Sequence, residues 1–302
     1  MRAKVFKLYF ETPLRIGEAG IGLERAGDIL HSDTLFGAIA NALAKLNEDV
    51  EELINKVKYG ELKFSSCFPF ENETYYLPAP QLPVEKKWKF LSLENFEKVI
   101  SGEIQDVKGD EIKSVKKLEI PKVVLDRVTS NSGIYYLTAV KFGDKSGLYF
   151  TVDGDDGVIK RALKFLQDEG IGGKRTWGLG KFKIEEDEIQ IREKGDCYTT
   201  LSLTYPKNLD SIVYWKPVVR SGWINTAKAT LRKPKVIMAS EGSVFKDAEE
   251  GDLVNLSIAY SDLSKKAGHE VHLNGKSFLC LLYTSDAADE GLGVDLGGRR
   301  II

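Results

Sequence analysis

Residues 158–189 read VIKRALKFLQDEGIGGKRTWGLGKFKIEEDEI, and this stretch sets the plan of the first part of the chain. Apolar side chains recur at helical spacing from Ile159 to Leu166, and Gly170 follows where a helix commonly ends. The segment KFKIEEDEI then predicts a strand. A glycine-rich loop over residues 170–180 therefore joins a helix to a strand.

The loop matches neither of the nucleotide-binding signatures that its glycines suggest. A Walker A loop needs Lys and then Ser or Thr where this chain has Leu179 and Gly180. A dinucleotide-binding loop opens a helix after a strand, whereas this loop follows a helix. Glycines permit positive φ and close backbone approach, so successive N–H groups can face an anion. Lys174 and Arg175 add charge and Trp177 offers a face for base stacking, with a plain flexible connection as the alternative.

The segments around this stretch extend the pattern. Residues 2–11 alternate polar and apolar as a half-buried strand does, and residues 31–46 carry a helical apolar stripe. Residues 64–68 indicate a strand, and residues 133–152 contain two aromatic and β-branched runs that predict a hairpin. The resulting order of strand, helix, strand, insertion, strand, helix, glycine loop and strand is the ferredoxin-like pattern.

Domain limits follow from changes in composition. Five prolines punctuate residues 69–125, which we expect to form an inserted, partly mobile excursion. From Cys197 short strands dominate and predict a smaller, β-rich domain. We therefore predict an α+β protein with a first domain over residues 1–194, an insertion at about 69–132, and a second domain over residues 195–279.

The last 23 residues are predicted to be foreign to the protein. CLLYTSDAADE and VDLGGRRII resemble in-frame translations of the two arms of a transposon-type sequencing adapter, in the right order. We therefore set residues 280–302 aside from the fold and expect the gene to continue differently. A Gly- and Asp-rich disordered terminus is the alternative, and resequencing the locus decides between them.

Composition limits the possible partners and cofactors. The 302 residues are 42% hydrophobic with a formal net charge of −2, so a site for a polyanion must be a local basic patch. No signal peptide or membrane span is visible, and three scattered cysteines suggest neither a zinc motif nor disulfides. We expect a cytoplasmic protein that needs no cofactor and does not contact membranes.

The sequence HSDT at residues 31–34 begins the first helix and offers a second anion site. Helix N–H groups beside the hydroxyls of Ser32 and Thr34 suit phosphate, although Ser32 or Asp33 could equally be an ordinary N-cap. His31 could serve as a base in metal-free RNA cleavage together with Lys174 or Arg175. A lone histidine beside a helix start is more often structural, so we expect no catalysis, and no side chains have metal-ligand spacing.

Six stretches taken in order resemble one known family. They are HSDTLFGAIANAL, DRVTSNSGIYY, GGKRTWGLGKF, VVRSGWI, RKPKVIMASEGSVF and GHEVHLNGKSF. Together they look like the RAMP-superfamily subunit of type III-A (Csm) CRISPR effector complexes that holds the 5′ handle of the crRNA. The resemblance spans residues 3 to about 279.

The resemblance implies a fold and partners. It implies two tandem ferredoxin-like (RRM-like) domains, a thumb-like β-hairpin within the insertion of the first, and no nuclease activity. It further implies docking onto the large polymerase-like subunit and onto the adjacent backbone RAMP subunit of the complex. The crRNA handle would lie between the first helix, the glycine loop and the neighbouring domain.

The resemblance also implies which residues contact RNA. Arg220 and Trp223 would lie on the RNA or at the domain interface, and for Trp223 a buried core indole is the favoured alternative. Arg232, with Lys233 and Lys235, would form a phosphate patch or a solvated face. The RNA-contacting set is His31, Ser32, Thr34, Arg127, Gly172, Gly173, Lys174, Arg175, Trp177, Gly178, Arg220, Trp223 and Arg232.

Overall fold

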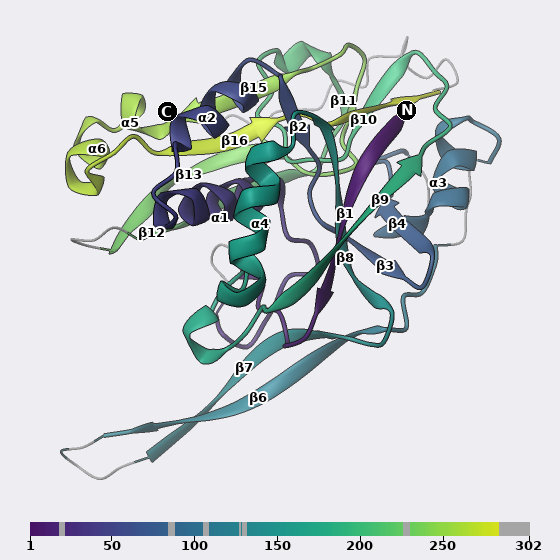
Figure 1. Ribbon diagram of the computed structural model, residues 1–302. Coiled ribbons are helices and arrows are strands. Elements are labelled where there is room, and N and C mark those ends of the chain that lie inside the picture. The colour runs from purple at the N-terminus through teal and green to yellow at the C-terminus, as the bar shows by residue number, and fades with distance from the viewer. Residues whose placement is uncertain are drawn as a thin grey trace.

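The computed structural model describes residues 1–17, 22–83, 88–104, 109–126, 128, 132–225 and 230–283. Helices and antiparallel sheets make it a mixed α+β protein, which confirms the predicted class (Figure 1). A seven-stranded sheet forms before residue 191 and a four-stranded sheet forms after it, and three two-stranded ribbons accompany them.

The helices and strands fall into two groups along the chain. Before residue 191 they are β1 (Arg2–Phe10), α1 (Ser32–Lys45), α2 (Val50–Lys58), β2 (Leu62–Phe64), β3 (Phe68–Glu71), β4 (Thr74–Pro78), β5 (Phe90–Ser92), α3 (Leu93–Ile100), β6 (Val115–Leu125), β7 (Ser132–Phe142), β8 (Ser146–Gly154), α4 (Gly157–Glu169) and β9 (Phe182–Gln190). After it they are β10 (Cys197–Thr200), β11 (Ile212–Tyr214), β12 (Pro217–Asn225), β13 (Thr230–Ala239), β14 (Val244–Phe245), β15 (Gly251–Asn255), α5 (Leu256–Ala259), α6 (Ser261–Ala267), β16 (His272–Lys276) and β17 (Leu279–Leu282).

The first sheet has the order β5-β4-β3-β8-β1-β9, and β2 also pairs with β8. Strand β1 is central, because Val5 lies opposite Thr151 of β8 on one side and Asp187 of β9 on the other. Along the chain, β1, α1, β3, β8, α4 and β9 follow the predicted succession of strand, helix, strand, strand, helix and strand. The glycine loop follows α4 and precedes β9, as predicted.

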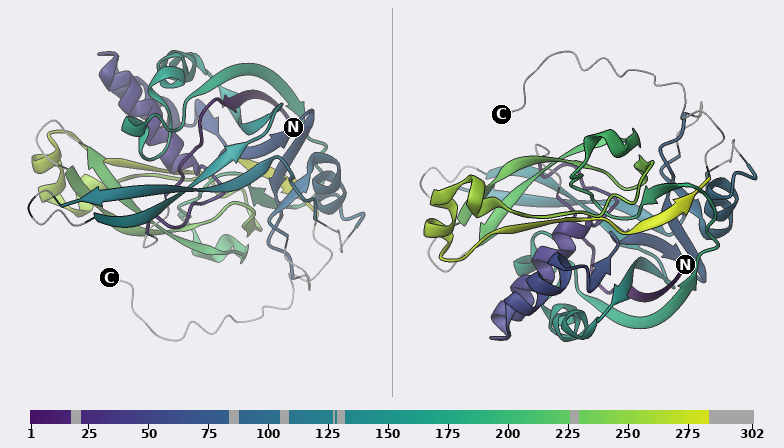
Figure 2. Two further views of the ribbon diagram at one scale, coloured as in Figure 1. Left: turned by 90° about the horizontal axis from the view of Figure 1, so that it is seen from below. Right: turned by 90° about the horizontal axis from the view of Figure 1, so that it is seen from above.

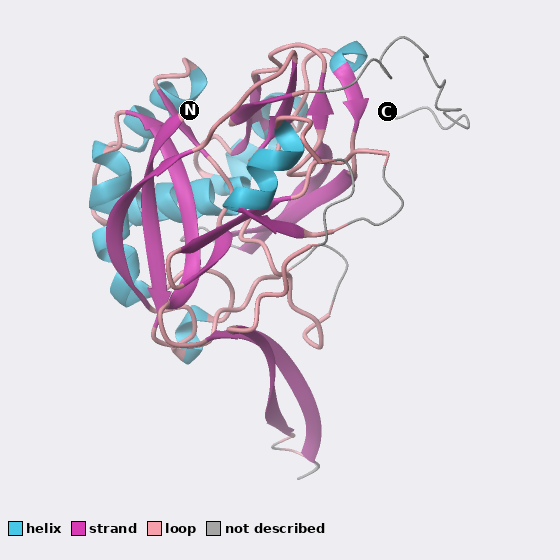
Figure 3. Cartoon of the chain, turned by 90° about the vertical axis from the view of Figure 1, so that its right-hand side faces the viewer, coloured by secondary structure: helices cyan, strands magenta, loops and turns pink. Residues whose placement is uncertain are grey.

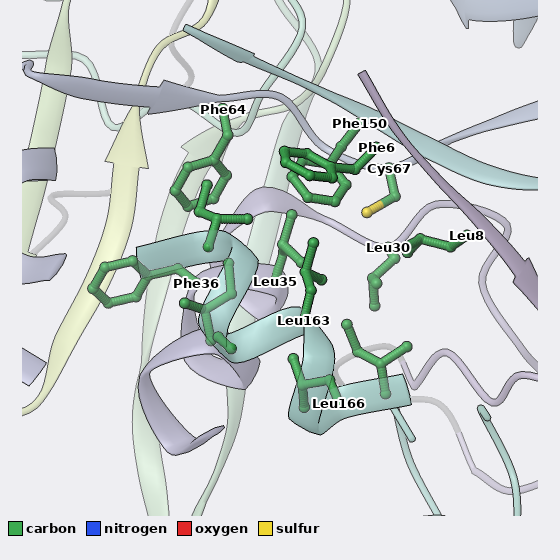
Figure 4. Close-up of a cluster of buried hydrophobic side chains, with 14 of the residues drawn as sticks. Phe6, Leu8, Leu30, Leu35, Phe36, Phe64, Cys67, Phe150, Leu163 and Leu166 are labelled. Atoms are coloured by element: carbon green, nitrogen blue, oxygen red, sulfur yellow. The ribbon is translucent and has the colours of Figure 1, made fainter. Parts of the chain in front are cut away.

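Helices α1 and α4 cover one face of the first sheet (Figures 1 and 4). Phe6 of β1 stacks on Phe150 of β8 with ring centroids 5.4 Å apart, and Leu35 and Leu163 reach this cluster from the two helices. All four side chains are buried. Burial of a side chain of this size contributes about 1.5–3 kcal/mol, so the alternation of β1 and the apolar stripes of the helices stabilise the same core.

The other face of the first sheet packs against the second sheet. Val5 and Tyr149 share one buried cluster with Leu201 and Phe278 from the second half of the chain. Because apolar side chains of both sheets are buried together, the two halves are packed directly against each other.

Much of the described part of residues 69–104 belongs to this core, so the expectation that the segment lies outside the core is wrong, while its mobility stays a prediction. Phe70, Tyr75, Leu77 and Phe96 are all buried in the cluster between the sheets. The prolines that suggested a loop are compatible with the short strands near the sheet edge, where a missing N–H donor is tolerated.

The hairpin predicted over residues 133–152 does not form. Strand β7 pairs with β6, from Val115 opposite Phe142 to Leu125 opposite Ser132, while β8 pairs with β1, β2 and β3. The aromatic pattern identified both strands but not their partners. The β6–β7 hairpin projects from the body (Figure 3) and continues past residue 132, where the insertion was expected to end. Its identity with the thumb-like hairpin that the resemblance implies stays a prediction.

The second sheet has the order β11-β14-β10-β17. Beside it lie two ribbons, β12–β13 and β15–β16. Leu203, Ile224, Met238 and Leu273 form a third buried cluster under these ribbons. Helix α1 packs against β16, which gives the second half of the chain another contact with the first.

Cys280, Leu281 and Leu282 belong to the fold, although we set them aside with the tail. They form most of β17, in which Cys280 lies opposite Thr199 and Leu282 lies opposite Cys197. Cys280 and Leu282 are buried. The limits of the two domains stay predictions, as does the foreign origin of the tail, whose residues 284–302 lie outside the described part of the chain.

Candidate RNA-binding surface

Arg15, in the connector between β1 and α1, organises the surface around the glycine loop. Its buried guanidinium donates to the carbonyl oxygens of Arg25 at 2.9 Å, Gly22 at 3.0 Å and Thr138 at 2.5 Å. Its own carbonyl accepts from the N–H of Gly173 at 2.8 Å. Arg15 therefore ties the connector, the base of strand β7 and the glycine loop together.

The glycine loop is closed by hydrogen bonds of its own backbone. The N–H of Ile171 donates to Gly180, the N–H of Gly180 donates to Pro13, and the N–H groups of Trp177 and Gly178 donate within the loop. These groups are therefore engaged inside the protein. These N–H groups are not available to an anion, so an anion at the loop would be bound mainly by side chains.

The glycines of the loop serve close packing. A Cβ on Gly172 would lie 2.5 Å from the carbonyl oxygen of Arg15, and one on Gly180 would lie 2.0 Å from that of Ile171. Both residues also have positive φ, near 87° and 81°. Gly178 has φ of 79° but open space around it. Gly172 thus allows the loop to pack closely against the connector, and Gly180 allows the two ends of the loop to pack against each other.

The exposed part of the loop is aromatic and cationic. Trp177 is 41% exposed, and the Nζ of Lys174 lies 4.4 Å from its ring centroid. The Nζ of Lys122, from strand β6 of the hairpin, lies 5.0 Å from the same centroid. We define these three residues as the loop–hairpin site. It joins the helix-to-strand loop to the projecting hairpin and combines a partly exposed indole with two cations that lie over its ring.

Arg175 lies beside this site but is partly engaged. Its guanidinium approaches the carboxylate of Glu169 at 3.5 Å, and Lys45 of α1 binds the same carboxylate at 2.5 Å. The hydrogen bond from Lys45 lowers the pKa of the Glu169 carboxyl and outweighs the opposing effect of burial. An RNA phosphate would compete with Glu169 for Arg175.

The start of helix α1 is closed, in contrast to the loop. His31 is the N-cap residue, although its side chain does not cap the helix, and Ser66 Oγ accepts from the N–H of Ser32 at 2.8 Å. The fully buried Ser32 hydroxyl accepts from the N–H of Leu203 at 3.1 Å. Ser32 and Asp33 are therefore not the N-cap, and Ser32 connects the two halves of the chain.

Asp33 and Arg220 form a buried ion pair across the two halves. Arg220 of β12 donates from Nε and Nη2 to the two carboxylate oxygens of Asp33, at 2.9 and 2.8 Å. It also donates to Thr34 Oγ1 at 3.0 Å. Burial opposes ionisation of Asp33, but the adjacent Arg220 guanidinium holds its pKa below the usual range. Arg220 therefore lies between the two halves of the chain, which is one of the two positions expected for it.

His31 is held by a second buried carboxylate. Its Nδ1 lies 2.7 Å from Glu241 Oε1, and Ser66 Oγ donates to the same oxygen. Burial opposes ionisation of Glu241, yet His31 and Ser66 keep the pKa of this carboxyl below its ordinary value. One ring nitrogen of His31 is thus committed to an interaction within the protein.

The other predicted RNA contacts are spread along the chain. Trp223 on β12 is 66% exposed, so the buried core position favoured for it is wrong. Arg232 lies opposite Trp223 in the ribbon and is exposed as well. Arg127 falls outside the described residues. The predicted set therefore divides among the loop, the closed helix start and the β12–β13 ribbon.

Sequence reasoning missed three residues that shape this region: Arg15, Lys122 and Glu241. Arg15 and Lys122 stand in segments that were assigned to a connector and to an insertion, and Glu241 lies 210 positions from His31. No local pattern joins such distant residues. Among the described residues, no group of three or more His, Cys, Asp or Glu side chains could hold a metal ion, and no helix could cross a membrane.

Two family models match the chain. The model of the RAMP superfamily matches residues 7–183, and the model of the CRISPR Csm4 C-terminal domain matches residues 193–282. Among curated relatives, the CRISPR system Cms protein Csm4 of Thermococcus onnurineus (strain NA1) is 36% identical over 280 residues, which cover 83% of this chain and 91% of the relative. The Csm4 protein of Methanocaldococcus jannaschii is 25% identical, with 92% and 97% covered.

Solved structures are similar over nearly the whole chain. A chain of the Csm1–Csm4 cassette in complex with cA4 has a TM-score of 0.68 and 27% sequence identity, with 95% of this chain and 100% of that chain covered. A chain of the Csm3–Csm4 subcomplex of the type III-A CRISPR-Cas interference complex has a TM-score of 0.65 at 18% identity, with 94% and 100% covered. Because the second structure is only 18% identical in sequence, its similarity is evidence for the fold alone.

Proposed function

Because the chain belongs to the Csm4 family of the RAMP superfamily, we propose that in a type III-A CRISPR effector complex it holds the 5′ handle of the crRNA without cutting it. The observation that carries this proposal is the loop–hairpin site. There the partly exposed indole of Trp177 lies beside Lys174 and Lys122, at the junction of the glycine loop and the hairpin, and a base that stacks on the ring would take the place of a lysine there. Single-stranded RNA is bound by this combination of an aromatic face and cations.

The proposed partners of the chain are the large subunit and the adjacent backbone RAMP subunit. The supporting observation is that a similar solved structure at 27% identity is an assembly of Csm1 with Csm4. For the backbone subunit the support is the shared fold with a chain of the Csm3–Csm4 subcomplex. Purification of the chain from cells that express all three proteins tests this part. Recovery of a stable complex with bound crRNA is the expected result, and a chain that purifies without either subunit contradicts it.

We also propose that both halves are ferredoxin-like. The first half has the strand order β9-β1-β8-β3, and the second has β17-β10-β14-β11. In both, the first and last strands of the unit are neighbours and the third lies between the first and the second. The second half has α5 and α6 in its second crossover, and only a short 3-10 turn over Leu209–Ser211 in its first. The repeated strand order supports two copies of one plan, of which the second has lost a helix.

The absence of catalysis is part of the proposal, and metal-free cleavage of precursor RNA is the rival function. The commitment of His31 Nδ1 to the buried Glu241 favours a structural role for this histidine. Incubation of the purified protein with precursor RNA in EDTA tests the point. Intact RNA is expected, whereas specific cleavage that disappears in His31→Ala would establish the rival function.

The binding proposal is tested by removing charge from the loop. Lys174→Ala combined with Arg175→Ala is expected to weaken binding of handle RNA to the effector complex and to lower its salt dependence. Loss of two phosphate contacts reduces the slope of log K against log salt by about 1.4 for single strands. Arg2→Ala combined with Lys58→Ala removes the same charge from exposed positions elsewhere and should leave the slope unchanged. An unaltered affinity and slope in the loop variant would contradict the proposal.

A further inference from the structure

We propose that the face of strand β16 that carries Asn274 and Lys276 is a binding site for a phosphate group, held between the two halves of the chain. We call it the β16 donor site and define it by these two residues together with Lys63 and Lys207. The stretch around it, residues 268–278, has no part in the loop–hairpin site. The inference goes beyond the proposed function and does not need RNA to be a ligand of the chain.

Two neighbouring donors on β16 are buried without a partner. Asn274 is 2% exposed and Lys276 is 7% exposed. The amide oxygen of Asn274 accepts from the N–H of Lys276 at 3.1 Å, which leaves Nδ2 of this amide as a donor. Among the described residues, neither this Nδ2 nor the Nζ of Lys276 has a hydrogen bond or an ion pair. Buried polar groups are normally satisfied, so two adjacent donors without acceptors indicate a ligand that supplies the acceptors.

Both side chains face the first half of the chain. Asn274 and Lys276 are two positions apart in a strand and therefore share one face. Leu253 of β15 lies opposite Asn274 and is buried in the same cluster as the apolar side chains of α1 and α2. Helix α1 packs against β16 and helix α2 packs against β15, as the views in Figures 1 and 2 show. The two donors therefore point toward the junction between the halves.

The charge at this junction favours an anion. Burial lowers the pKa of Lys276, and the nearby ammonium groups of Lys207 and Lys63 lower it further. The carboxylates of Glu250 and Asp252 act in the opposite direction. Asp252 is itself engaged by Lys207 at 3.9 Å. Three cations thus share the region with two carboxylates, and one positive charge is left in excess beside the unpartnered donors.

The donor set selects a small oxyanion. An ammonium and an amide N–H both donate, so they offer nothing to a metal cation and suit the several acceptor oxygens of phosphate. Lysine binds phosphate as a point charge, and the amide adds a directed hydrogen bond. Because Lys276 is only 7% exposed, a free ion or a terminal phosphate reaches it more readily than a carboxylate on the surface of a folded partner.

The backbone holds the donors in place. The carbonyl oxygen of Lys276 accepts from Ser202 Oγ at 2.9 Å. Lys276 lies opposite Gly251, where a Cβ would come within 2.0 Å of the carbonyl oxygen of Gly275 and φ is 63°. This close packing fixes the end of β16 before a ligand binds, and a site that is already ordered loses less entropy on binding.

The β16 donor site lies far from the proposed handle site. Figure 1 shows β16 in the upper part of the molecule and the β6–β7 hairpin at its lower end. Lys63 belongs to β2 in the first half, whereas Asn274 and Lys276 belong to the second half. A phosphate bound here would therefore link the halves and stabilise their packing.

Calorimetric titration of the full chain with inorganic phosphate tests the inference, with chloride at equal ionic strength as the reference. We expect saturable binding at one site and a higher melting temperature in phosphate. Lys276→Gln should weaken binding at least about tenfold, because a hydrogen bond to a charged group is lost, whereas Lys276→Arg should retain most of it. Lys246→Gln removes an exposed lysine of the same half and should change nothing.

A second variant guards against a misfolded chain. Asn274→Asp keeps the oxygen that accepts from the N–H of Lys276 but replaces the Nδ2 donor by an anion. It should fold, pair with Lys276 and abolish phosphate binding. Binding by Asn274→Asp or Lys276→Gln that equals that of the unaltered chain would overturn the site.

The source of the phosphate is separated by parallel titrations with ADP and with 5′-phosphorylated oligouridine. Tighter saturation by ADP than by inorganic phosphate, again lost in Asn274→Asp, assigns the site to a nucleotide, and the reverse order assigns it to the free ion. No saturable binding of any of the three ligands overturns the inference. The handle site is tested by Lys174→Ala with Arg175→Ala, so either proposal can fail while the other stands.

Discussion

The glycine loop and the start of helix α1 have similar chemistry in the sequence, but the loop stays exposed in the folded protein and the helix start is buried. Both combine backbone N–H groups with polar side chains, and both are sequence candidates for binding phosphate. At the helix start Asp33 and Glu241 are buried carboxylates that occupy the cations and donors around them. At the loop, Trp177 stays 41% exposed beside Lys174 and Lys122. The protein's own anion at the loop, Glu169, engages Arg175 but leaves Lys174 and Lys122 beside the exposed indole, whereas the carboxylates at the helix start are buried with their partners.

The comparison predicts its largest effect at the closed helix start. Arg220→Ala leaves the buried carboxylate of Asp33 without its partner, and breaking a buried pair in this way costs about 3–5 kcal/mol. Chemical denaturation should show this loss in the free energy of unfolding. Arg232→Ala, on the same ribbon but exposed, is the control and should change stability little. An equal, small effect of both variants would show that the helix start is not locked by the pair.

The loss of stability on substituting a loop glycine by alanine should depend on the space around that glycine. Gly180→Ala forces a Cβ to within 2.0 Å of the carbonyl oxygen of Ile171 at positive φ, so that the two ends of the loop must move apart. We expect a loss of about 2 kcal/mol or more of unfolding free energy. Gly178→Ala meets open space and should cost only about 1 kcal/mol for its left-handed backbone. Equal losses would mean that the close packing of Gly180 against Ile171 does not matter.

The closed helix start should also make the protein sensitive to acid. Asp33 and Glu241 have pKa values below the ordinary range in the folded protein, so their stabilisation is complete above the unfolded values of about 3.9 and 4.3. It is lost as the pH falls from there toward the folded pKa values. Stability should therefore drop steeply below about pH 4, and Asp33→Asn should make this drop shallower. Asp144→Asn, in an exposed turn, should leave the slope as it is.

The smallest effect is expected at the contact between hairpin and loop. Lys122→Ala removes one cation from Trp177, and an exposed cation–π contact contributes about 0.5–1 kcal/mol. Stability should change by no more than this, while the salt slope of RNA binding falls by about 0.7. Tryptophan fluorescence and RNA titrations at several salt concentrations measure the two quantities. A change in stability without any change in the slope would reduce Lys122 to a structural residue.

Local patterns located most elements but not their partners. The period-2 alternation of β1 and the helical stripes of α1 and α4 predicted these elements within a few residues. Strands β7 and β8 were also located, yet they pair with β6 and with β1 rather than with each other. The register of a strand depends on which segment meets it in the folded chain, and a run of aromatic residues suits several partners.

The candidate site was found only in part, for a related reason. Trp177 and Lys174 stand next to the glycines and were identified, whereas Lys122 and Arg15 reach the same region from distant segments. The exposure of Trp223 contradicts the usual preference of tryptophan for burial. Its neighbour in sequence, Arg220, takes the buried side of the ribbon instead.

Local spacing and an ordered set of short stretches were enough to establish the α+β class, the helix-loop-strand unit around residues 170–180, and the family. That the helix start is closed and the loop is open became visible only in the folded chain. Asp33 and Arg220 are 187 positions apart, and His31 and Glu241 are 210 apart. Whether a charged group faces solvent or a buried partner depends on packing between such distant segments, and no local pattern records that packing.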